Sequence, residues 1–181
     1  MRRRIFIAIN LPEKIKNQMA DFQLKWPELP CRWVKRENLH LTLAFLGYLT
    51  DEEIINVCKT AKETTLKYSP FVIKMDKIIY GPPKKPARMV WLEGEKSENL
   101  TKLQDDLAGA LGIKEERDYS PHLTLGRLKQ WEFQRLEPEE RPEINEDISL
   151  GFEVSSIEIM ESQLKRNGPI YTILESCPLK S

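Results

Sequence analysis

The tetrapeptide His40-Leu41-Thr42-Leu43 recurs as His122-Leu123-Thr124-Leu125, and these two copies contain the only histidines of the chain. A glycine follows each copy, Gly47 after the first and Gly126 after the second. Each copy also lies between segments whose apolar spacing is typical of amphipathic helices. A motif repeated in matching surroundings indicates one fold unit used twice.

Each copy has the alternation of polar and apolar residues that predicts a β-strand. Successive side chains of a strand point to opposite faces of the sheet, so His40 and Thr42 should share one face while Leu41 and Leu43 share the other. The second copy repeats this pattern. The leucines can be buried as core, which leaves a polar face in each half. If pseudo-twofold symmetry relates the halves, two imidazoles and two hydroxyls should converge across a cleft.

Strand patterns outnumber helical patterns along the rest of the chain. Strands are expected at residues 4–9, 32–34, 39–43, 71–80, 88–93, 122–128, 150–154, 157–164 and 171–174. Helices are expected from a capping box at Asn10 and Glu13 to about Trp26, after a second capping box at Thr50 and Glu53, and from Ser97 to Gly112. Residues 81–86 read as a basic loop, residues 129–148 as mostly connection, and residues 167–169 as a turn. Short connections between strands favour an α+β fold with a mainly antiparallel sheet.

The composition excludes several classes of protein. The 28 Lys and Arg residues balance the 28 Asp and Glu residues, so no overall positive field attracts long nucleic acid. No apolar run is long enough to span a membrane, and the apolar stretch after Arg4 is too short for a secretory signal. Cys31, Cys58 and Cys177 form no CxxC pair, which argues against a disulfide framework or a cysteine zinc site. We expect a cytoplasmic monomer without membrane contact.

Two histidines suit phosphoryl chemistry. Imidazole titrates near pH ~6.5, so one ring can be neutral and remove a proton while the other is protonated and donates one. The hydroxyls of Thr42 and Thr124 can bind phosphate oxygens, and this scheme needs neither a metal nor a cofactor. Metal binding is a poorer interpretation, because the chain has no HExxH or HxH motif. Two packed strands whose histidines only form local hydrogen bonds are a further alternative.

The paired tetrapeptides resemble the HxTx motifs of the two-histidine (2H) phosphoesterase superfamily, in particular its LigT-like RNA 2′,3′-cyclic phosphodiesterases, also called 2′-5′ RNA ligases. The resemblance extends over nearly the whole chain. It includes residues 4–9, 33–47, 88–92 and 120–127, together with Ser162, Leu164, Gly168 and Tyr171. The family implies a bilobal fold with two pseudo-symmetric, mainly antiparallel lobes, flanking helices and a central active-site cleft. Residues 1–181 would then form a single domain of two intertwined lobes with one HxTx motif each.

The resemblance also implies an activity: hydrolysis of a terminal 2′,3′-cyclic phosphate to a 2′-phosphomonoester. RNA with such an end, tRNA fragments among them, would be the partner. His40 would be the proton donor and His122 the proton acceptor, an order that the two equivalent motifs do not fix. The same acid and base would permit ATP-independent 2′-5′ ligation in reverse. Three other 2H reactions remain open, on ADP-ribose cyclic phosphate, on 2′-5′ oligoadenylate or in RNA 3′-end trimming, as does a nucleotide- or RNA-binding module without turnover.

Two further residues differ between the copies. Arg127 follows His122 by five positions, and the matching residue of the first copy is Phe45. This suggests that Arg127 binds the phosphate and that Phe45 stacks on a base. An odd offset puts Arg127 on the face opposite His122, unless a bulge at Gly126 reverses the alternation. A solvated strand end for Arg127 and a core position for Phe45 are the plainer alternatives.

Overall fold

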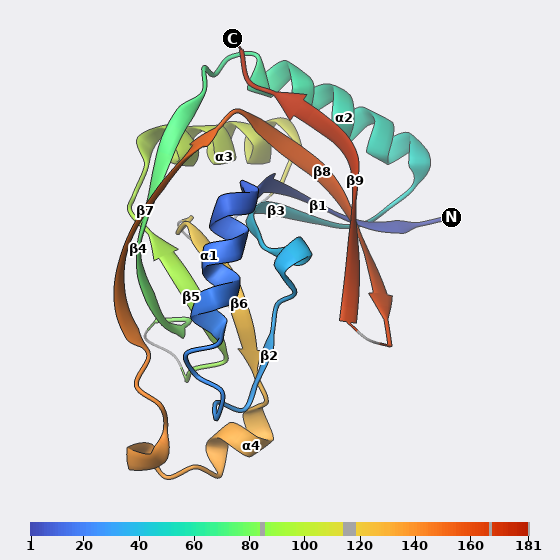
Figure 1. Cartoon of the computed structure of the whole chain (residues 1–181). Helices are drawn as coiled ribbons and strands as arrows, with labels where there is room; N and C mark the ends of the chain where they lie inside the picture. The colour runs from blue at the N-terminus through green and yellow to red at the C-terminus, as the bar shows by residue number, and fades with distance from the viewer. Residues whose placement is uncertain (84–85, 114–118, 167, 181) are drawn as a thin grey trace.

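The computed structural model of the chain describes residues 1–83, 86–113, 119–166 and 168–180. Within these ranges, nine strands form one sheet, accompanied by four α-helices and two short 3-10 helices (Figure 1). Every strand pair is antiparallel. The α+β class and the antiparallel sheet predicted from the sequence are therefore confirmed.

The strands alternate with the helices along the chain. The strands are β1 (Arg3–Asn10), β2 (Cys31–Trp33), β3 (His40–Leu49), β4 (Phe71–Gly81), β5 (Met89–Gly94), β6 (His122–Leu128), β7 (Asn145–Val154), β8 (Ser156–Lys165) and β9 (Gly168–Pro178). The helices are α1 (Glu13–Gln23), α2 (Asp51–Thr65), α3 (Glu98–Ala110) and α4 (Gln130–Gln134), with the 3-10 turns η1 (Arg36–Asn38) and η2 (Pro138–Glu140).

The strand order relates the two halves of the sheet. The order is β7-β4-β5-β6-β3-β1-β8-β9. One half-sheet therefore contains β6, β5, β4 and β7, the other contains β3, β1, β8 and β9, and the two motif strands, β6 and β3, lie next to each other in the middle. The two half-sheets join through one residue pair, Leu41 opposite Leu123. Further along β6, β2 replaces β3 as its partner, from Trp33 opposite Gly126 to Cys31 opposite Leu128. The lobes therefore share one sheet that forks where β3 and β2 separate.

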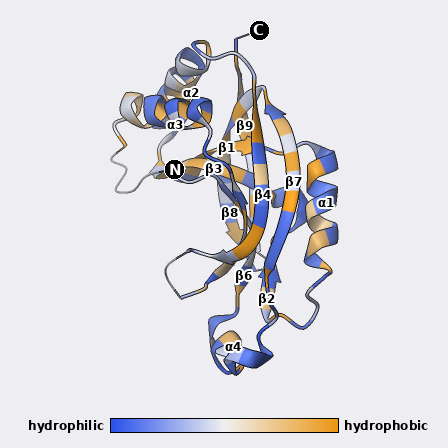
Figure 2. Ribbon diagram, turned by 90° about the vertical axis from the view of Figure 1, so that its left-hand side faces the viewer, coloured by the Kyte–Doolittle hydropathy of each residue, from blue (hydrophilic) through white to orange (hydrophobic). Residues whose placement is uncertain are grey.

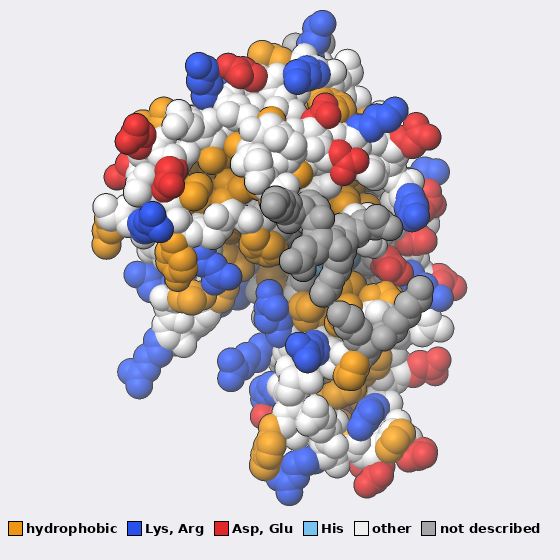
Figure 3. All heavy atoms as spheres, turned by 180° about the vertical axis from the view of Figure 1, so that it is seen from behind, with side chains coloured by type: hydrophobic (Ala, Val, Ile, Leu, Met, Phe, Trp, Pro, Cys, Tyr) orange, Lys and Arg blue, Asp and Glu red, His pale blue; other side chains and the backbone are white. Residues whose placement is uncertain are grey.

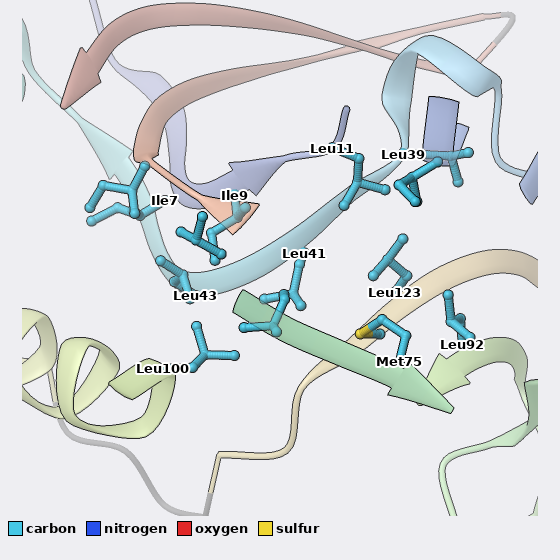
Figure 4. Packing of buried hydrophobic residues seen from close by; sticks show 14 of the residues in the cluster. Ile7, Ile9, Leu11, Leu39, Leu41, Leu43, Met75, Leu92, Leu100 and Leu123 are labelled. Atoms are coloured by element: carbon cyan, nitrogen blue, oxygen red, sulfur yellow. The ribbon is translucent and has the colours of Figure 1, made fainter. Parts of the chain in front are cut away.

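The core lies on the leucine face of the motif strands. Leu41, Leu43, Leu123 and Leu125 are buried in one hydrophobic cluster. Figure 4 shows the first three with residues of the neighbouring strands and with Leu100 of α3. Figures 1 and 2 show α2 and α3 side by side at one end, and α1 alongside the strands of the other half. Gln23 at the end of α1 donates hydrogen bonds of 3.0 Å to the carbonyl oxygens of Val34 and Leu125. Buried residues of α1, α2 and α3 belong to the same core cluster as these leucines, so the helices pack against the leucine side of the sheet.

Of the two predicted capping boxes, one is confirmed and one is wrong. At α2, the Glu53 amide donates to the Thr50 hydroxyl (3.3 Å) and the Thr50 amide donates to the Glu53 carboxylate (2.7 Å). At α1, the helix begins after Pro12 without a side-chain cap. Asn10 cannot cap this helix because it is still paired with His40 in the sheet.

Several boundaries also differ from the sequence prediction. The first helix ends at Gln23 rather than Trp26, which turns into the core and stacks on Trp33. Strand β3 continues through Gly47, whose φ of 77° fits the irregular pairing there, and β7 begins at Asn145 within the expected connection. Residues 84–85 of the expected basic loop and residue 167 of the expected turn lie outside the described residues. Among the described residues, no helix has the length and apolar character needed to cross a bilayer.

Candidate active site

The two motifs meet where the half-sheets join. His40 begins β3, His122 begins β6, and the residue after each forms the pair that links these strands. The leucines of both motifs are buried, whereas the histidines and threonines keep partial exposure. The predicted alternation is confirmed, and it presents Thr42 and Thr124 on the same side as the imidazoles.

The two imidazoles are held in the same way. Nδ1 of His40 lies 2.7 Å from the carbonyl oxygen of Asn38, and Nδ1 of His122 lies 2.8 Å from that of Ser120. A carbonyl oxygen only accepts, so each Nδ1 carries the hydrogen and each neutral ring keeps its lone pair on Nε2. The Nε2 atom of His40 is also 3.1 Å from the hydroxyl oxygen of Thr42. Each ring therefore has Nε2 as the nitrogen able to exchange a proton with a substrate.

Burial and neighbouring charges act on both rings. Burial is the largest effect and lowers the pKa of His40, which the positive charges of Arg127 and Lys16 lower further, while the Asn38 carbonyl opposes them. Burial also lowers the pKa of His122, but the Ser120 carbonyl and the negative charge of Glu93 oppose it. Both rings are thus biased towards the neutral form in the free protein, rather than one neutral and one protonated. The charges differ in sign, positive around His40 and negative around His122.

A β-bulge brings Arg127 to the histidine face. Val90 lies opposite Gly126 and Trp91 lies opposite Thr124, so Leu125 is the extra residue and the alternation reverses after it. The Arg127 guanidinium and the Thr124 hydroxyl both approach the sulfur of Met89, at 3.6 and 4.0 Å. The bulge that Arg127 required in order to share the face of His122 is therefore present beside Gly126, and the odd offset no longer argues against a role for Arg127 in the site.

The first copy has the same irregularity. Thr42 lies opposite Ala8 and Ala44 opposite Ile7, after which Phe45 lies opposite Phe6. The Phe45 ring is 66% exposed, and its centroid lies 6.1 Å from that of Phe6. Phe6 in turn lies 5.0 Å from the His40 ring. Phe45 is therefore an exposed aromatic surface near His40 and not a core residue.

Each histidine has its own aromatic neighbour. The Trp91 ring stacks on the His122 ring, with centroids 3.9 Å apart and an interplanar angle of 25°. The Tyr171 ring contacts the His40 ring edge-on, with centroids 5.2 Å apart and an interplanar angle of 89°. The family resemblance had included both Tyr171 and the segment 88–92 that contains Trp91. The contact of Trp91 with His122 depends on the pairing of β5 with β6, for which the sequence carries no local signal. Trp33 stacks on Trp26, with ring centroids 6.3 Å apart.

Two polar residues near His40 were also missed by sequence reasoning. The buried Asn38 side chain donates a 2.9 Å hydrogen bond to the carbonyl oxygen of Pro169 in β9. Asn38 thus ties the β8–β9 hairpin, which carries Tyr171, to the residue whose carbonyl holds His40. Lys16 of α1 is 5% exposed and ion-paired with Glu13 at 3.5 Å. A lysine on a charged helix gives no sequence signal that it will be buried near a catalytic candidate.

The histidine side of the molecule is hollowed. Figure 3 shows a recess between the projecting β8–β9 hairpin and the body that contains β2 and β6, with Lys and Arg side chains gathered around it. The arrangement offers proton-transfer groups and positive charge to an anionic substrate.

Comparisons with known proteins identify the family of the chain. Residues 11–166 match the sequence profile of the 2′-5′ RNA ligase superfamily. The chain is 35% identical to the RNA 2′,3′-cyclic phosphodiesterase of Methanocaldococcus jannaschii, over 95% of this chain and 98% of the relative. Among solved structures, a protein of Thermus thermophilus matches with a TM-score of 0.83 and 27% identity over 98% of each chain. Escherichia coli LigT in complex with 3′-AMP matches with a TM-score of 0.82 and 26% identity over both full chains. The chain therefore belongs to the 2′-5′ RNA ligase superfamily.

Proposed function

We propose that this protein is an RNA 2′,3′-cyclic phosphodiesterase that hydrolyses a terminal 2′,3′-cyclic phosphate to a 2′-phosphomonoester. The single observation that carries this proposal is the matched pair of imidazoles, each held through Nδ1 with Nε2 available for proton transfer, on adjacent strands of one sheet. Relatives that bear this activity in their names match nearly the whole chain, which supports it independently. The shared sheet also supports treating residues 1–181 as one domain.

The reaction needs one base and one acid on opposite sides of phosphorus. Nε2 of His122 takes a proton from water as the water oxygen bonds to phosphorus. Nε2 of His40 gives its proton to the 3′ oxygen as the bond from phosphorus to that oxygen breaks. Each such transfer contributes roughly 10²–10⁴-fold to the rate. These steps involve no metal. When the 5′-hydroxyl of a second RNA attacks phosphorus in place of water, the same bond from phosphorus to the 3′ oxygen breaks and a 2′-5′ phosphodiester forms without ATP.

The surrounding residues have defined roles in this scheme. Thr42, Thr124 and Arg127 bind the non-bridging phosphate oxygens, and Phe45 stacks on a base. Burial and the charges near His40 disfavour its proton in the free protein, so a donor role depends on the substrate. An anionic phosphate beside Arg127 cancels that positive charge and favours the protonated ring.

The decisive assay uses a short RNA that ends in a 2′,3′-cyclic phosphate, incubated with EDTA present. The wild-type protein should release a 2′-phosphate product. His40→Ala and His122→Ala should each lose at least about 10²-fold in turnover, because each removes one proton transfer. Thermal unfolding of the variants serves as the folding control, and Lys59→Gln on the exposed side of α2 controls for a surface substitution.

Other outcomes would redirect the assignment. A 3′-phosphate product would overturn the proposed order of bond breaking. Turnover that disappears with EDTA would overturn the metal-independent scheme. A folded protein that is inactive on this RNA would move the activity to ADP-ribose cyclic phosphate, to 2′-5′ oligoadenylate or to 3′-end trimming, and binding without any turnover would indicate a binding module.

A further inference from the structure

Arg32 lies beside Arg127 on the histidine face. The pairing of β2 with β6 sets Arg32 directly opposite Arg127, and directly opposed residues of antiparallel strands share a face with Cβ atoms about 5 Å apart. Arg127 itself is on the face of Thr124 because both approach the sulfur of Met89. Both arginines are exposed. Arg32 thus extends the positive charge of the site from β6 to the neighbouring edge strand.

This pair of arginines is unfavourable for the fold alone. Like charges that face each other across two strands repel, and among the described residues no carboxylate lies within ion-pair distance of either guanidinium. The contact of the Arg127 guanidinium with the sulfur of Met89 is weak, because a thioether is a poor acceptor. Two adjacent guanidiniums without an acid form a site for an anion, and their fork geometry suits phosphate.

The position of Arg32 suggests which phosphate it binds. His122, Thr124 and Arg127 follow one another along one face of β6, and Arg32 lies one strand further out, at the far end of this row from His122. Arg127 reaches the reacting phosphate in the proposed function. Arg32 is therefore suited to the next phosphate along the substrate, which any RNA of two or more nucleotides carries.

We propose that Arg32 binds the phosphodiester between the terminal nucleotide and its 5′ neighbour, so that the protein prefers oligonucleotide ends to nucleoside 2′,3′-cyclic phosphates. This inference rests on the proposed function for the position of the reacting phosphate. Because Arg32 is exposed and its charge faces another positive charge, replacing it with an uncharged residue removes a repulsion and no core contact.

The test pairs a charge on the protein with a charge on the substrate. The substrates are the dinucleotide ApA ending in a 2′,3′-cyclic phosphate, the same molecule with an uncharged methylphosphonate linkage, and adenosine 2′,3′-cyclic phosphate. Arg32→Gln should lower the ratio of kcat/KM between the charged and uncharged dinucleotides by about tenfold, the loss typical of one charged hydrogen bond. Lys59→Gln, an equal change of charge on α2, should leave the ratio as in the wild type, and Figures 1 and 2 show α2 far from β2.

Two further readouts separate phosphate binding from a structural role. For the charged dinucleotide, log kcat/KM should decrease with log salt less steeply in Arg32→Gln than in the wild type. The magnitude of this negative slope should be smaller by about 0.7, as expected for one lost phosphate contact on a single strand. Arg32→Lys should recover part of the ratio because it keeps the charge without the fork. The melting temperature of Arg32→Gln should not fall below that of the wild type.

The result also distinguishes this inference from the proposed function. A charged-to-uncharged ratio that is equal in wild type and Arg32→Gln would overturn the role of Arg32 even if turnover is fast. If the wild type hydrolyses none of the three substrates, the proposed function fails. Binding of the corresponding dinucleotide 2′-phosphates, with charged and uncharged linkages, then tests Arg32 by the same comparison, and equal loss of affinity for both would overturn it.

Discussion

Replacing Arg127 with Gln tests both phosphate binding and the division of labour between the two histidines. The guanidinium is exposed and contacts the sulfur of Met89 only weakly, so the substitution should cost little in folding stability. The proposed contact of Arg127 with a phosphate is a charge-assisted hydrogen bond, whose loss costs about 1.5–3 kcal/mol. At about 1.4 kcal/mol per tenfold, kcat/KM should fall about 10- to 150-fold.

The pH profile of the same variant identifies the role of His40. Arg127 lowers the pKa of His40 and is not among the groups that shift His122, so removing its charge should raise the pKa of His40 alone. A proton donor loses activity as the pH rises through its pKa, whereas a base loses activity as the pH falls through it. If His40 is the donor, the high-pH limb of the kcat/KM profile moves to higher pH and the low-pH limb stays in place.

The assay is initial-rate hydrolysis of an RNA 2′,3′-cyclic phosphate over the pH range in which the protein stays folded, for wild type, Arg127→Gln and Arg127→Lys. The lysine variant keeps the charge and should keep the wild-type limbs while losing part of the rate. Movement of the low-pH limb instead would show that His40 is the base and would refute the assigned order. Unchanged kinetics in Arg127→Gln would refute phosphate binding by Arg127.

Three other substitutions or conditions have expected outcomes. Trp91→Leu should lower kcat about tenfold with little change in KM, measured by steady-state kinetics, because His122 loses the ring that orients it. Asn38→Ala should lower the free energy of unfolding by about 1–3 kcal/mol in denaturant titrations, because the Pro169 carbonyl loses its buried donor. Burial lowers the pKa of both histidines, so the unfolded chain binds protons more readily below pH ~6.5. The melting temperature should therefore fall as the pH drops from about 7 to about 5, and it should fall less in His40→Gln.

The sequence predicts the parts of the fold that depend on local pattern. The alternation in the repeated tetrapeptides predicts which face each side chain takes, and the Thr50–Glu53 capping box predicts the start of α2. The box at Asn10 and Glu13 is misleading because pairing of Asn10 with the first motif strand competes with capping. Tertiary pairing therefore decides between two uses of one residue, which a local pattern does not reveal.

In the candidate site, too, local sequence pattern predicts some features and tertiary pairing decides the others. The repeat singles out the histidines, and the role expected for Arg127 requires a bulge, which the pairing of β5 and β6 contains. The contacts of Trp91, Lys16 and Asn38 depend on which strands and helices become neighbours, through a sheet order in which β1 lies between β3 and β8. Composition places these residues among ordinary core or surface positions, so only the assembled fold gives them a role.

Two identical motifs become unequal through what surrounds them. His40 lies near Arg127 and Lys16, and His122 lies opposite Glu93, although the tetrapeptides themselves are the same. Arg127 follows the second motif in sequence, yet its charge acts on the histidine of the first, because the strands that carry them are joined at Leu41 and Leu123. An anion held by Arg127 therefore changes the protonation of His40 more than that of His122. Under the proposed function, the substrate itself would assign the acid and the base, and the duplicated unit would then supply the two different groups that the reaction needs.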